Sequence, residues 1–492
     1  MTALLPAQRW LSQLALVAAA AFAAMYLLTA MPRLVYPYDL DFIEDGILMT
    51  ALRLAHNQPV FIAPNANFVP HVYMPLYPWL GGLLFQLFSP TFLWLRLLSL
   101  TATLITGGLV FWIARRESSS TWLGLVCAGL FLGGYRLNGF WYELARVDSL
   151  FAALGLAGLA VGIYGRHTRR GLMGAGFLLA LACWTKQTGL ILGGGLGLYL
   201  LAVRRRQVWP FWLTFGLLTI VPAIWLNSRS GGWFFYYTFH IARLNPIEIE
   251  RVISFVTHEL LGLMAGLSVM TIGAARLAWR RAGWPGLWQQ PWLVCLALAV
   301  VISGLGRASV GGNINNRMVG YTLLCLAPAL LLGEWRRQPD LRPQWSAGLI
   351  ALLVLAQFTL GVYNPLRYIP TPVMRQSGER LIAKIAATNG EVLVLMHPYY
   401  ACLAGKTPSL QLAALWHARE RGVRPLPPDI LARLESHYYA AIISDESLFE
   451  TDPAWQELLN RYYTPIQTLP PELSPPTTTG MLVRPKIVYA PR

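Results

Sequence analysis

Apolar stretches long enough to cross a lipid bilayer recur along this 492-residue chain, and they constrain its fold more than any other feature. A membrane-spanning helix needs about 20 mostly apolar residues. Only 13% of the residues are charged, about half the roughly 25% typical of a soluble protein. The sequence therefore predicts an α-helical, multi-pass membrane protein. The eleven predicted spans lie near residues 10–30, 92–114, 121–138, 148–165, 171–185, 188–203, 208–227, 259–279, 291–306, 319–333 and 345–363.

The net charge of +16 predicts how the chain is oriented in the membrane. With the N-terminus inside the cell, the inner loops hold 15 basic and three acidic residues, and the outer loops of residues 1–363 hold 11 basic and nine acidic residues. The excess of positive charge on the inner side is typical of membrane proteins, so we expect a cytoplasmic N-terminus in a cell (inner or plasma) membrane. Because the orientation of the chain in the membrane accounts for most of the excess positive charge, no nucleic-acid partner is expected.

Residues 364–492 have the composition of a small α/β domain, and an odd number of spans places this domain outside the cell. Residues 1–363 form the transmembrane region. Two strands are expected at Glu391–Met396 and Ala440–Ser444. The tail from Pro470 to Thr479, rich in proline and threonine, is expected to be irregular. The expected helices lie near Val373–Thr388, Ser409–Arg419, Pro428–His437 and Pro453–Tyr462.

The first outer loop, residues 32–91, carries four acids within seven residues. They are Asp39, Asp41, Glu44 and Asp45. Crowded carboxylates raise one another's pKa, which suits one of them to act as a general base. The alternative interpretation is a solvated acidic turn that caps the following helix. Helical patterns over Glu44–His56 and from the Tyr73 block to about Phe88 are too short to span, so they predict two helices lying on the outer membrane surface.

Several short blocks along the chain carry a family resemblance. Together they resemble the GT-C superfamily of integral membrane glycosyltransferases, and in particular its protein mannosyltransferases and aminoarabinose transferases, the family 39-like branch. The likeness is best over about the first 200 residues. After the acidic motif, the blocks are Tyr73-Met74-Pro75-Leu76-Tyr77, Arg96-Leu97-Leu98-Ser99, Arg115-Arg116, residues 142–148 (YELARVD) and residues 184–188 (WTKQT), with a weaker echo at residues 311–317 (GGNINNR).

The resemblance implies a reaction and a catalytic group. Members of the superfamily move a sugar from a polyprenyl-phosphate carrier to an acceptor on the outer face, with inversion, and an acid of the first outer loop acts as the base. The resemblance does not decide whether the acceptor hydroxyl belongs to a glycan, a lipid or a protein. Glu44-Asp45-Gly46 and Asp39-Leu40-Asp41 each fit a form of the family motif, so Asp41 and Asp45 are equal candidates for the base. No cofactor is expected, although four carboxylates could bind a divalent metal.

Residues that would hold the substrate and its phosphate are predicted at the outer ends of the spans. Lys186 is the only lysine before residue 384, and it either binds a lipid phosphate or extends its ammonium to the interface. Arg146 and Asp148 either contact substrate or form a structural ion pair. His397, at the end of a buried strand, is expected to be structural. The predicted ligand set is Lys186, Arg146, Asp148, Gln187, Tyr73, Asn313 and Arg317.

Two rival functions remain open at this point. A polytopic transporter or lipid flippase should show internal repeats and ionisable residues near the middle of the bilayer, and the sequence shows neither clearly. A scaffold that only displays the outer domain would have no need of the acidic loop. Membrane lipids are partners under every one of these interpretations.

Overall fold

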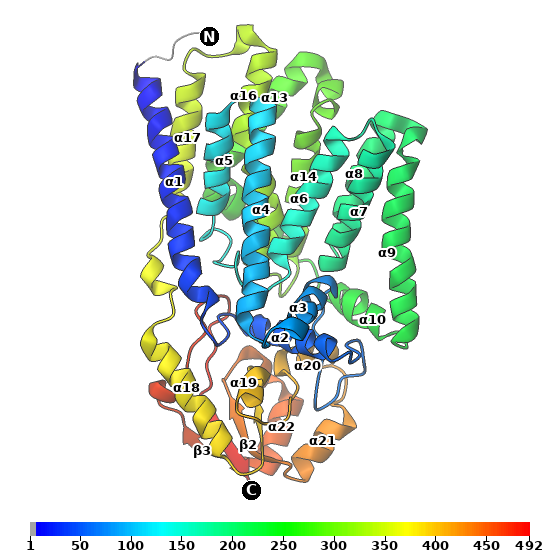
Figure 1. Cartoon of the computed structure of the whole chain (residues 1–492), viewed down its shortest axis with the longest axis vertical. Helices are drawn as coiled ribbons and strands as arrows, with labels where there is room; N and C mark the ends of the chain where they lie inside the picture. The colour runs from blue at the N-terminus through cyan, green and yellow to red at the C-terminus, as the bar shows by residue number, and fades with distance from the viewer. Residues whose placement is uncertain (1–5) are drawn as a thin grey trace.

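The computed structural model describes residues 6–492, and these form two stacked regions (Figure 1). A bundle of long helices makes up one region, and a small domain of helices and strands makes up the other. Helices α2 (Phe42–Ala55) and α3 (Leu76–Leu87) lie crosswise between the two regions (Figure 1). Both helices were expected on the membrane surface, and both are present with nearly the predicted bounds.

Every one of the eleven apolar stretches lies on helical structure, which confirms the predicted fold class. The long or apolar helices of the bundle are α1 (Pro6–Leu34), α4 (Phe92–Ser118), α5 (Thr121–Gly133), α6 (Asp148–Tyr164), α7 (Arg169–Thr185), α8 (Gly189–Arg204), α9 (Trp209–Arg229), α13 (Ala265–Trp288), α14 (Pro291–Ala308), α15 (Met318–Leu324), α16 (Ala327–Arg337) and α17 (Ser346–Leu360). Short helices join them: η1 (Arg205–Val208), α10 (Trp233–Phe235), η2 (Tyr236–His240), α11 (Ile241–Arg243), α12 (Ile249–Ser254), η3 (Phe255–Leu263), η4 (Ile314–Arg317), η5 (Pro339–Leu341) and η6 (Pro365–Arg367).

Six of the described segments are long and apolar enough to cross a membrane by themselves, so the chain is a multi-pass membrane protein. Within the segment 314–337, the 18 residues of its most apolar stretch are all buried inside the protein. Helices α5, α6 and α8 are apolar but shorter than 18 residues. One stretch differs from the prediction: residues 259–279 are not one helix, because η3, a π-helix, meets α13 at 93°. The backbone leaves helical geometry at Met264 (φ −117°, ψ 24°), where the two helices join.

The C-terminal domain contains a four-stranded sheet in the order β1-β2-β4-β3. Strands β1 and β2 are parallel, and the other two pairings are antiparallel. The four predicted helices and two predicted strands are present within a few residues of their expected bounds. The elements are α18 (Pro372–Ala387), β1 (Glu391–Val394), α19 (Pro398–Leu403), α20 (Leu412–Ala418), α21 (Pro428–Glu435), β2 (Tyr439–Ser444), η7 (Leu448–Thr451), α22 (Pro453–Tyr462), β3 (Tyr463–Thr468), η8 (Pro471–Leu473) and β4 (Ile487–Pro491).

Strands β3 (Tyr463–Thr468) and β4 (Ile487–Pro491) were not predicted from the sequence. Most of β3 is exposed and it contains Pro465, so it lacks the apolar alternation by which a half-buried strand is found. It lies at the edge of the sheet, where proline is tolerated. Between β3 and β4 the chain is irregular apart from η8, as expected for the tail.

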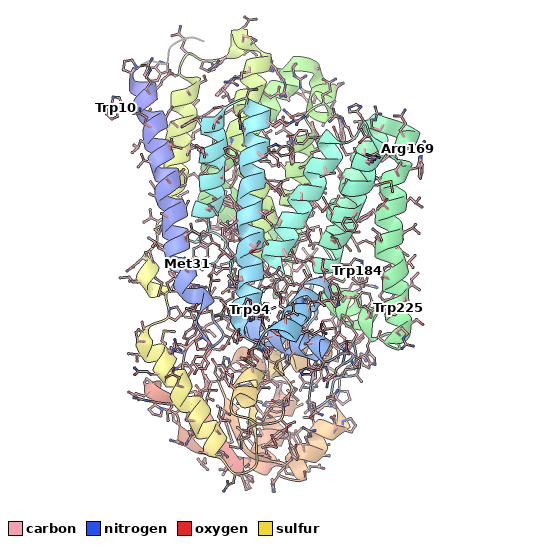
Figure 2. The ribbon with its side chains drawn as sticks, viewed as in Figure 1. Trp10, Met31, Trp94, Arg169, Trp184 and Trp225 are labelled. Atoms are coloured by element: carbon pink, nitrogen blue, oxygen red, sulfur yellow. The ribbon has the colours of Figure 1, made fainter. Side chains whose placement is uncertain are left out.

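Aromatic residues gather at the end of the bundle that faces the C-terminal domain. Trp94, Trp184 and Trp225 lie there, whereas Trp10 and Arg169 lie at the opposite end (Figure 2). Tryptophan rings are enriched at both membrane interfaces, and arginine marks the cytoplasmic side. The arrangement agrees with the predicted orientation, which stays a prediction.

Candidate active site

The four acids of the first outer loop are buried where the bundle, α2 and the C-terminal domain meet. Asp39, Asp41, Glu44 and Asp45 are each at most 1% exposed. A solvated acidic turn is therefore wrong as a description of this loop, although Asp41 does cap α2 by accepting a hydrogen bond from the Ile43 amide. Because buried carboxylates need partners, the partner of each acid indicates what that acid can do.

Glu44 is held by Arg96 of α4 in a two-pronged ion pair. Arg96 Nε lies 2.9 Å from Oε1 of Glu44, and Nη2 lies 2.7 Å from Oε2. The amides of Leu40 and Ala145 donate to the same carboxylate, both at 2.7 Å. Arg96 also donates to the carbonyl oxygens of residues 33, 36 and 38. With all its oxygens engaged, Glu44 is a structural anchor and has no free oxygen for a substrate.

Asp39 contacts the C-terminal domain. Its Oδ2 lies 2.9 Å from Nδ1 of His397, and its Oδ1 accepts a hydrogen bond of 2.6 Å from the Tyr400 hydroxyl. The second ring nitrogen of His397 lies 2.7 Å from Asp445 Oδ2. Burial alone would lower the pKa of His397, but the two carboxylates outweigh burial and hold this pKa well above its usual value. His397 is therefore an imidazolium between two carboxylates, and it fixes the acidic loop to the domain.

Asp45 accepts a hydrogen bond of 3.0 Å from the Tyr399 amide, while its other oxygen has no hydrogen-bond partner among the described residues. Burial, and next the charge of Asp39, raise the pKa of Asp45 well above its usual range, against the opposing effect of His397. The adjacent Gly46 leaves room for the ring of His71, since a Cβ atom there would lie 1.9 Å from His71 Nε2.

Asp41 differs from the other three acids because it joins the loop to a cationic cluster. Its Oδ1 accepts a hydrogen bond of 2.6 Å from Arg146 Nη1, and its Oδ2 has no hydrogen-bond partner among residues 6–492. Burial raises the pKa of Asp41 to about 6, with Arg146 opposing the shift and Glu44 adding to it. Asp41 can thus be ionised at neutral pH with one oxygen free to accept a proton.

The cluster around Arg146 contains four of the seven predicted ligand residues. Asp148 Oδ2 lies 3.4 Å from Arg146 Nε, and Asp148 Oδ1 lies 2.7 Å from Lys186 Nζ. Tyr73 receives a hydrogen bond of 3.2 Å from Arg146 Nη2. Lys186 also donates to the side-chain oxygen of Asn316, at 3.0 Å. Arg146 and Asp148 therefore form an ion pair with each other. Through this pair, an unbroken chain of charged groups runs from Asp41 to Lys186.

The other three predicted ligands lie elsewhere. The side chain of Gln187 donates to the carbonyl oxygens of Val72 and Thr238, so it ties the loops together. Asn313 is exposed and its side chain accepts from the amide of Ile314, a local turn contact. Arg317 pairs with Glu259 at 3.2 Å and not with the Lys186 cluster. Roles for these three in substrate binding stay predictions.

A cavity of about 660 Å³ opens beside the Lys186 turn. Cys183 and Leu190, which flank Lys186 in the chain, line it, as does Met74. The rest of its wall comes from α9 and from the loop that follows, where His240 and Arg243 add polar groups to an otherwise apolar lining. Lys186 itself does not line this cavity, and its side chain faces a small separate pocket with Asp148 and Asn316. An apolar cavity that carries Arg243 at its wall matches an amphipathic lipid with a negative head group.

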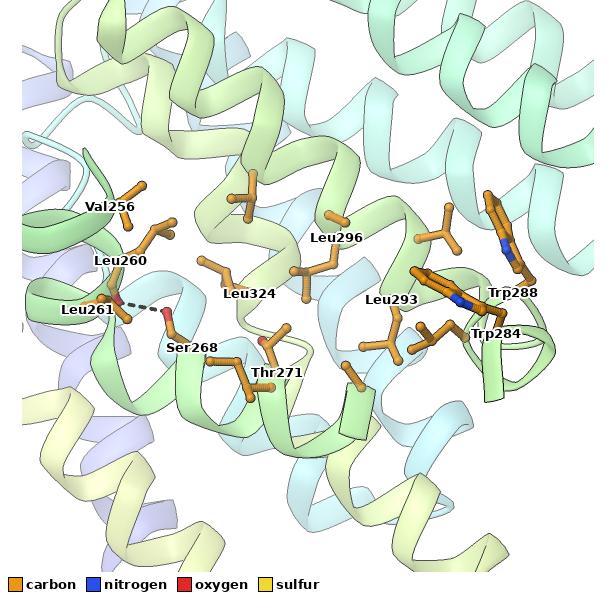
Figure 3. Close-up of a pocket in the computed structure, with 16 residues that line it drawn as sticks. Val256, Leu260, Leu261, Ser268, Thr271, Trp284, Trp288, Leu293, Leu296 and Leu324 are labelled. Carbon is orange, nitrogen blue, oxygen red and sulfur yellow. Dashed lines mark hydrogen bonds between the residues drawn. The ribbon is translucent and has the colours of Figure 1, made fainter. Parts of the chain in front are cut away.

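A second cavity, of about 490 Å³, lies between η3, α13 and α14 (Figure 3). Its walls are apolar, with Leu293, Leu296 and Trp284 on the sides, and the Ser268 hydroxyl is already bonded to the carbonyl oxygen of Leu260 at 2.8 Å. It has no ionisable lining residue, so it offers acyl-chain packing and no chemistry.

The acids do not form a metal-binding set. Each of the four carboxylates turns to a different partner, and no group of three or more His, Cys, Asp or Glu side chains in the described part of the chain could hold a metal ion. We therefore derive no step through a metal.

Several residues of this site were not predicted. His397, Tyr399, Tyr400 and Gly480 come from the C-terminal domain, more than 350 residues after the acids they contact, and Asp445 of the same domain pairs with His397. No local pattern marks such a contact. Arg96 opens one of the recognised blocks, but its role depends on a partner that lies 52 positions away.

No protein-family model and no curated protein matches the sequence of this chain. Its structure is similar to ArnT from Cupriavidus metallidurans in the apo state, with a TM-score of 0.60 and 15% identity over 96% of this chain and 97% of that one. The chain therefore shares its fold with ArnT. ArnT bound to undecaprenyl phosphate gives a TM-score of 0.58 at 14% identity, with the same coverage.

A more distant GT-C structure also matches. The oligosaccharyltransferase of Archaeoglobus fulgidus in the apo form has a TM-score of 0.51 and 12% identity, over 92% of this chain and 73% of that one. At these identities the likeness shows the fold, and the chemistry has to be argued from the site.

Replacing Arg96 by Gln should destabilise the protein. The change leaves Glu44 buried without its cation and frees three carbonyl oxygens, and breaking such a buried pair costs about 3–5 kcal/mol. We expect a clearly lower melting temperature of the purified protein in detergent. Arg115→Gln, at the exposed end of the same helix, is the control. Equal melting temperatures for the two variants would show that the pair is not an anchor.

Proposed function

We propose that this protein is a membrane glycosyltransferase that moves a sugar from a polyprenyl phosphate to an acceptor hydroxyl. One observation carries the proposal: Asp41 has a free oxygen, and it is connected through Arg146 and Asp148 to Lys186. Lys186 stands in the turn between Cys183 and Leu190, two residues that line an apolar cavity. A base and a phosphate-binding cation thus lie at opposite ends of one cluster. The GT-C fold, shared with a protein whose structure holds undecaprenyl phosphate, supports the same reaction.

Asp41 is the acid best suited to be the base. Glu44 has no free oxygen, Asp39 is bonded through both oxygens, and burial together with the charge of Asp39 raises the pKa of Asp45 well above its usual range. A general base works best when its pKa lies near the operating pH, and that of Asp41 is raised to about 6. The ambiguity between Asp41 and Asp45 is therefore resolved, in this proposal, in favour of Asp41.

The donor would enter through the cavity beside Lys186. Its polyprenyl chain would lie against Met74, Leu190 and the apolar wall of α9. Its phosphate would extend past the turn between α7 and α8 to the Lys186 ammonium, which lines a separate small pocket with Asp148 and Asn316. The leaving phosphate gains negative charge as the glycosidic bond breaks, so a fixed cation stabilises the transition state more than the ground state. Asn316 already bonds this ammonium and would help to orient it.

The atoms of the reaction balance as follows. The acceptor oxygen forms a bond to the anomeric carbon, on the face opposite the phosphate, and its proton passes to Asp41 Oδ2. The bond between that carbon and the phosphate oxygen breaks, and polyprenyl phosphate leaves with the electron pair. Displacement from the opposite face inverts the anomeric configuration. Asp41 then returns its proton to water.

Replacing Asp41 by Asn should abolish transfer. Removing a general base costs about 10²- to 10⁴-fold in rate. Asp45→Asn should keep most of the activity, because Asn resembles the protonated carboxyl of Asp45. We would delete the gene, reintroduce each variant, and measure surface glycans and lipid-linked sugars by mass spectrometry. The D41N cells should accumulate an unused lipid-linked sugar, which would identify the donor.

Both proteins must be present in the membrane at the level of the natural chain, which immunoblotting checks. Normal glycans in D41N cells would remove Asp41 from the mechanism. Loss of glycans in D45N cells alone would transfer the role of base to Asp45.

The reaction should depend on pH through Asp41. Since the base must be ionised, and since burial raises the pKa of Asp41 to about 6, kcat/KM should be level above that pH. It should fall about tenfold for each pH unit below it. Purified protein assayed from pH 4.5 to 8 gives the profile. The residual activity of D41N should lack this acid limb, and a limb that persists in D41N would belong to another group.

Lys186 should bind the phosphate of the carrier lipid. Replacing Lys186 by Met removes one charge-assisted hydrogen bond, which should weaken undecaprenyl phosphate binding by about tenfold or more. Binding is measured with purified protein and undecaprenyl phosphate by the shift in melting temperature. Lys186→Arg keeps the charge and should restore part of the affinity. Unchanged affinity in K186M would leave Lys186 with only its structural contact to Asp148.

A further inference from the structure

The tail of the C-terminal domain lies directly over the candidate base. Residues 477–481 cross the acidic loop, where the amides of Thr478 and Thr479 both donate to the carbonyl oxygen of Leu40, at 3.1 and 3.0 Å. Arg33 Nη2 donates to the Thr479 hydroxyl at 2.9 Å. Leu40 precedes Asp41, so the tail is attached to the backbone that carries the base. We call residues 477–481 the strap.

Gly480 covers the free oxygen of Asp41. A Cβ atom at position 480 would lie 2.1 Å from Asp41 Oδ2 and 3.2 Å from Cζ2 of Trp141, and the φ angle of +72° also disfavours any side chain. Gly480 itself is exposed, whereas Asp41 and Trp141 are buried. One residue of backbone therefore separates the carboxylate from the outside of the molecule.

Two buried polar atoms beneath the strap have no hydrogen-bond partner within residues 6–492. One is the acceptor Asp41 Oδ2, and the other is the donor Trp141 Nε1. In an indole ring, Nε1 and Cζ2 are both bonded to Cε2, so Nε1 lies close to the place that Gly480 occupies. Leaving buried polar groups unpaired costs stability, and proteins keep such groups mostly where a ligand satisfies them. A free acceptor beside a free donor matches a molecule with neighbouring hydroxyl groups.

The ring of Trp141 is held in place for such a ligand. Its face packs against the guanidinium of Arg146, with 4.6 Å between the carbon Cζ and the ring centroid. Arg146 in turn pairs with Asp41. The indole donor and the carboxylate therefore keep a fixed relation through one arginine, whether or not the strap is in place.

We propose that the strap occupies the acceptor site, and that a hydroxyl-bearing carbohydrate acceptor displaces it. In the open state one acceptor hydroxyl would donate to Asp41 Oδ2, and a neighbouring oxygen would accept from Trp141 Nε1. The closed strap keeps water from the base when no acceptor is bound. This inference rests on the proposed function, since it assigns the acceptor subsite of the same reaction.

The strap is built to open as a unit. Two hydrogen bonds join its first residue, Thr477, to Val483 just beyond its end. The Thr477 amide donates to the Val483 carbonyl oxygen, and the Val483 amide donates to the Thr477 hydroxyl, both at 2.9 Å. These internal contacts survive when the contacts to Leu40 and Arg33 break. Opening then costs only a few hydrogen bonds, and the sheet of the domain stays intact.

Two variants should open the strap without altering the base. Gly480→Ala places a methyl group against Asp41 Oδ2, and Thr479→Val removes the hydroxyl that Arg33 binds. Hydrogen exchange of the Thr478 and Thr479 amides, followed by mass spectrometry on the full-length protein in detergent, measures opening without any substrate. Losing a charge-assisted hydrogen bond should speed this exchange by about tenfold. Leu482→Ala, at a side chain that is 72% exposed, is the matched control and should exchange at the natural rate.

Kinetics then test whether the strap competes with the acceptor. If it does, Thr479→Val should lower the KM for the acceptor identified from the surface glycans by the factor by which it speeds amide exchange, and kcat and the KM for the donor should not change. Gly480→Ala, which places a methyl group beside the proposed base, is used for the exchange measurement alone. Unchanged exchange, or faster exchange with an unchanged or higher acceptor KM, would overturn the proposal. If the natural protein transfers no sugar at all, the proposed function fails, and faster exchange in both variants still supports a strap over Asp41.

Discussion

The buried pair of Glu44 and Arg96 is the interaction on which the candidate site depends. Glu44 belongs to the acidic loop and Arg96 to the second long span, and the pair is completely buried. The same carboxylate accepts from the Ala145 amide, next to Arg146, and from the Leu40 amide, next to Asp41. One side chain thus brings together Asp41, the proposed base, and Arg146. A buried ion pair contributes little net stability, so positional precision is its main effect here.

Four carboxylates within seven residues acquire four different properties from their surroundings. Arg96 satisfies Glu44, and the His397 imidazolium satisfies Asp39. Burial and the charge of Asp39 raise the pKa of Asp45 well above its usual range, whereas burial raises that of Asp41 only to about 6 and leaves its Oδ2 unengaged. Enzymes commonly assign acid and base roles by separating the pKa values of neighbouring carboxyls. Here burial is the largest cause of both raised pKa values, and His397 and the Tyr399 amide of the C-terminal domain oppose the rise at Asp45.

The sequence predicted what local patterns determine. Hydropathy located the eleven apolar stretches, and periodicity located α2 and the helices of the C-terminal domain. The sequence also pointed to the acidic loop and to Arg146, Asp148 and Lys186, and these residues lie together in the structure. It did not choose between Asp41 and Asp45, because the choice depends on His397 and Arg146, whose distances from the acids in sequence exceed 100 positions. Strand β3 was missed for a different reason, since an exposed edge strand leaves no apolar pattern.

The C-terminal domain is therefore part of the candidate site and not a separate attachment. A base in a membrane enzyme has to be dry enough for its pKa to approach neutrality, and yet open enough to receive a polar acceptor. Helices of the bundle can meet only the first requirement, because their surfaces face lipid and one another. A domain outside the bilayer can cover the base with a short segment such as residues 477–481 and release it at the cost of a few hydrogen bonds. Gly480 meets both needs at one position: its lack of a side chain lets the backbone close on Asp41 Oδ2, and its exposed face leaves a direct route to the acceptor.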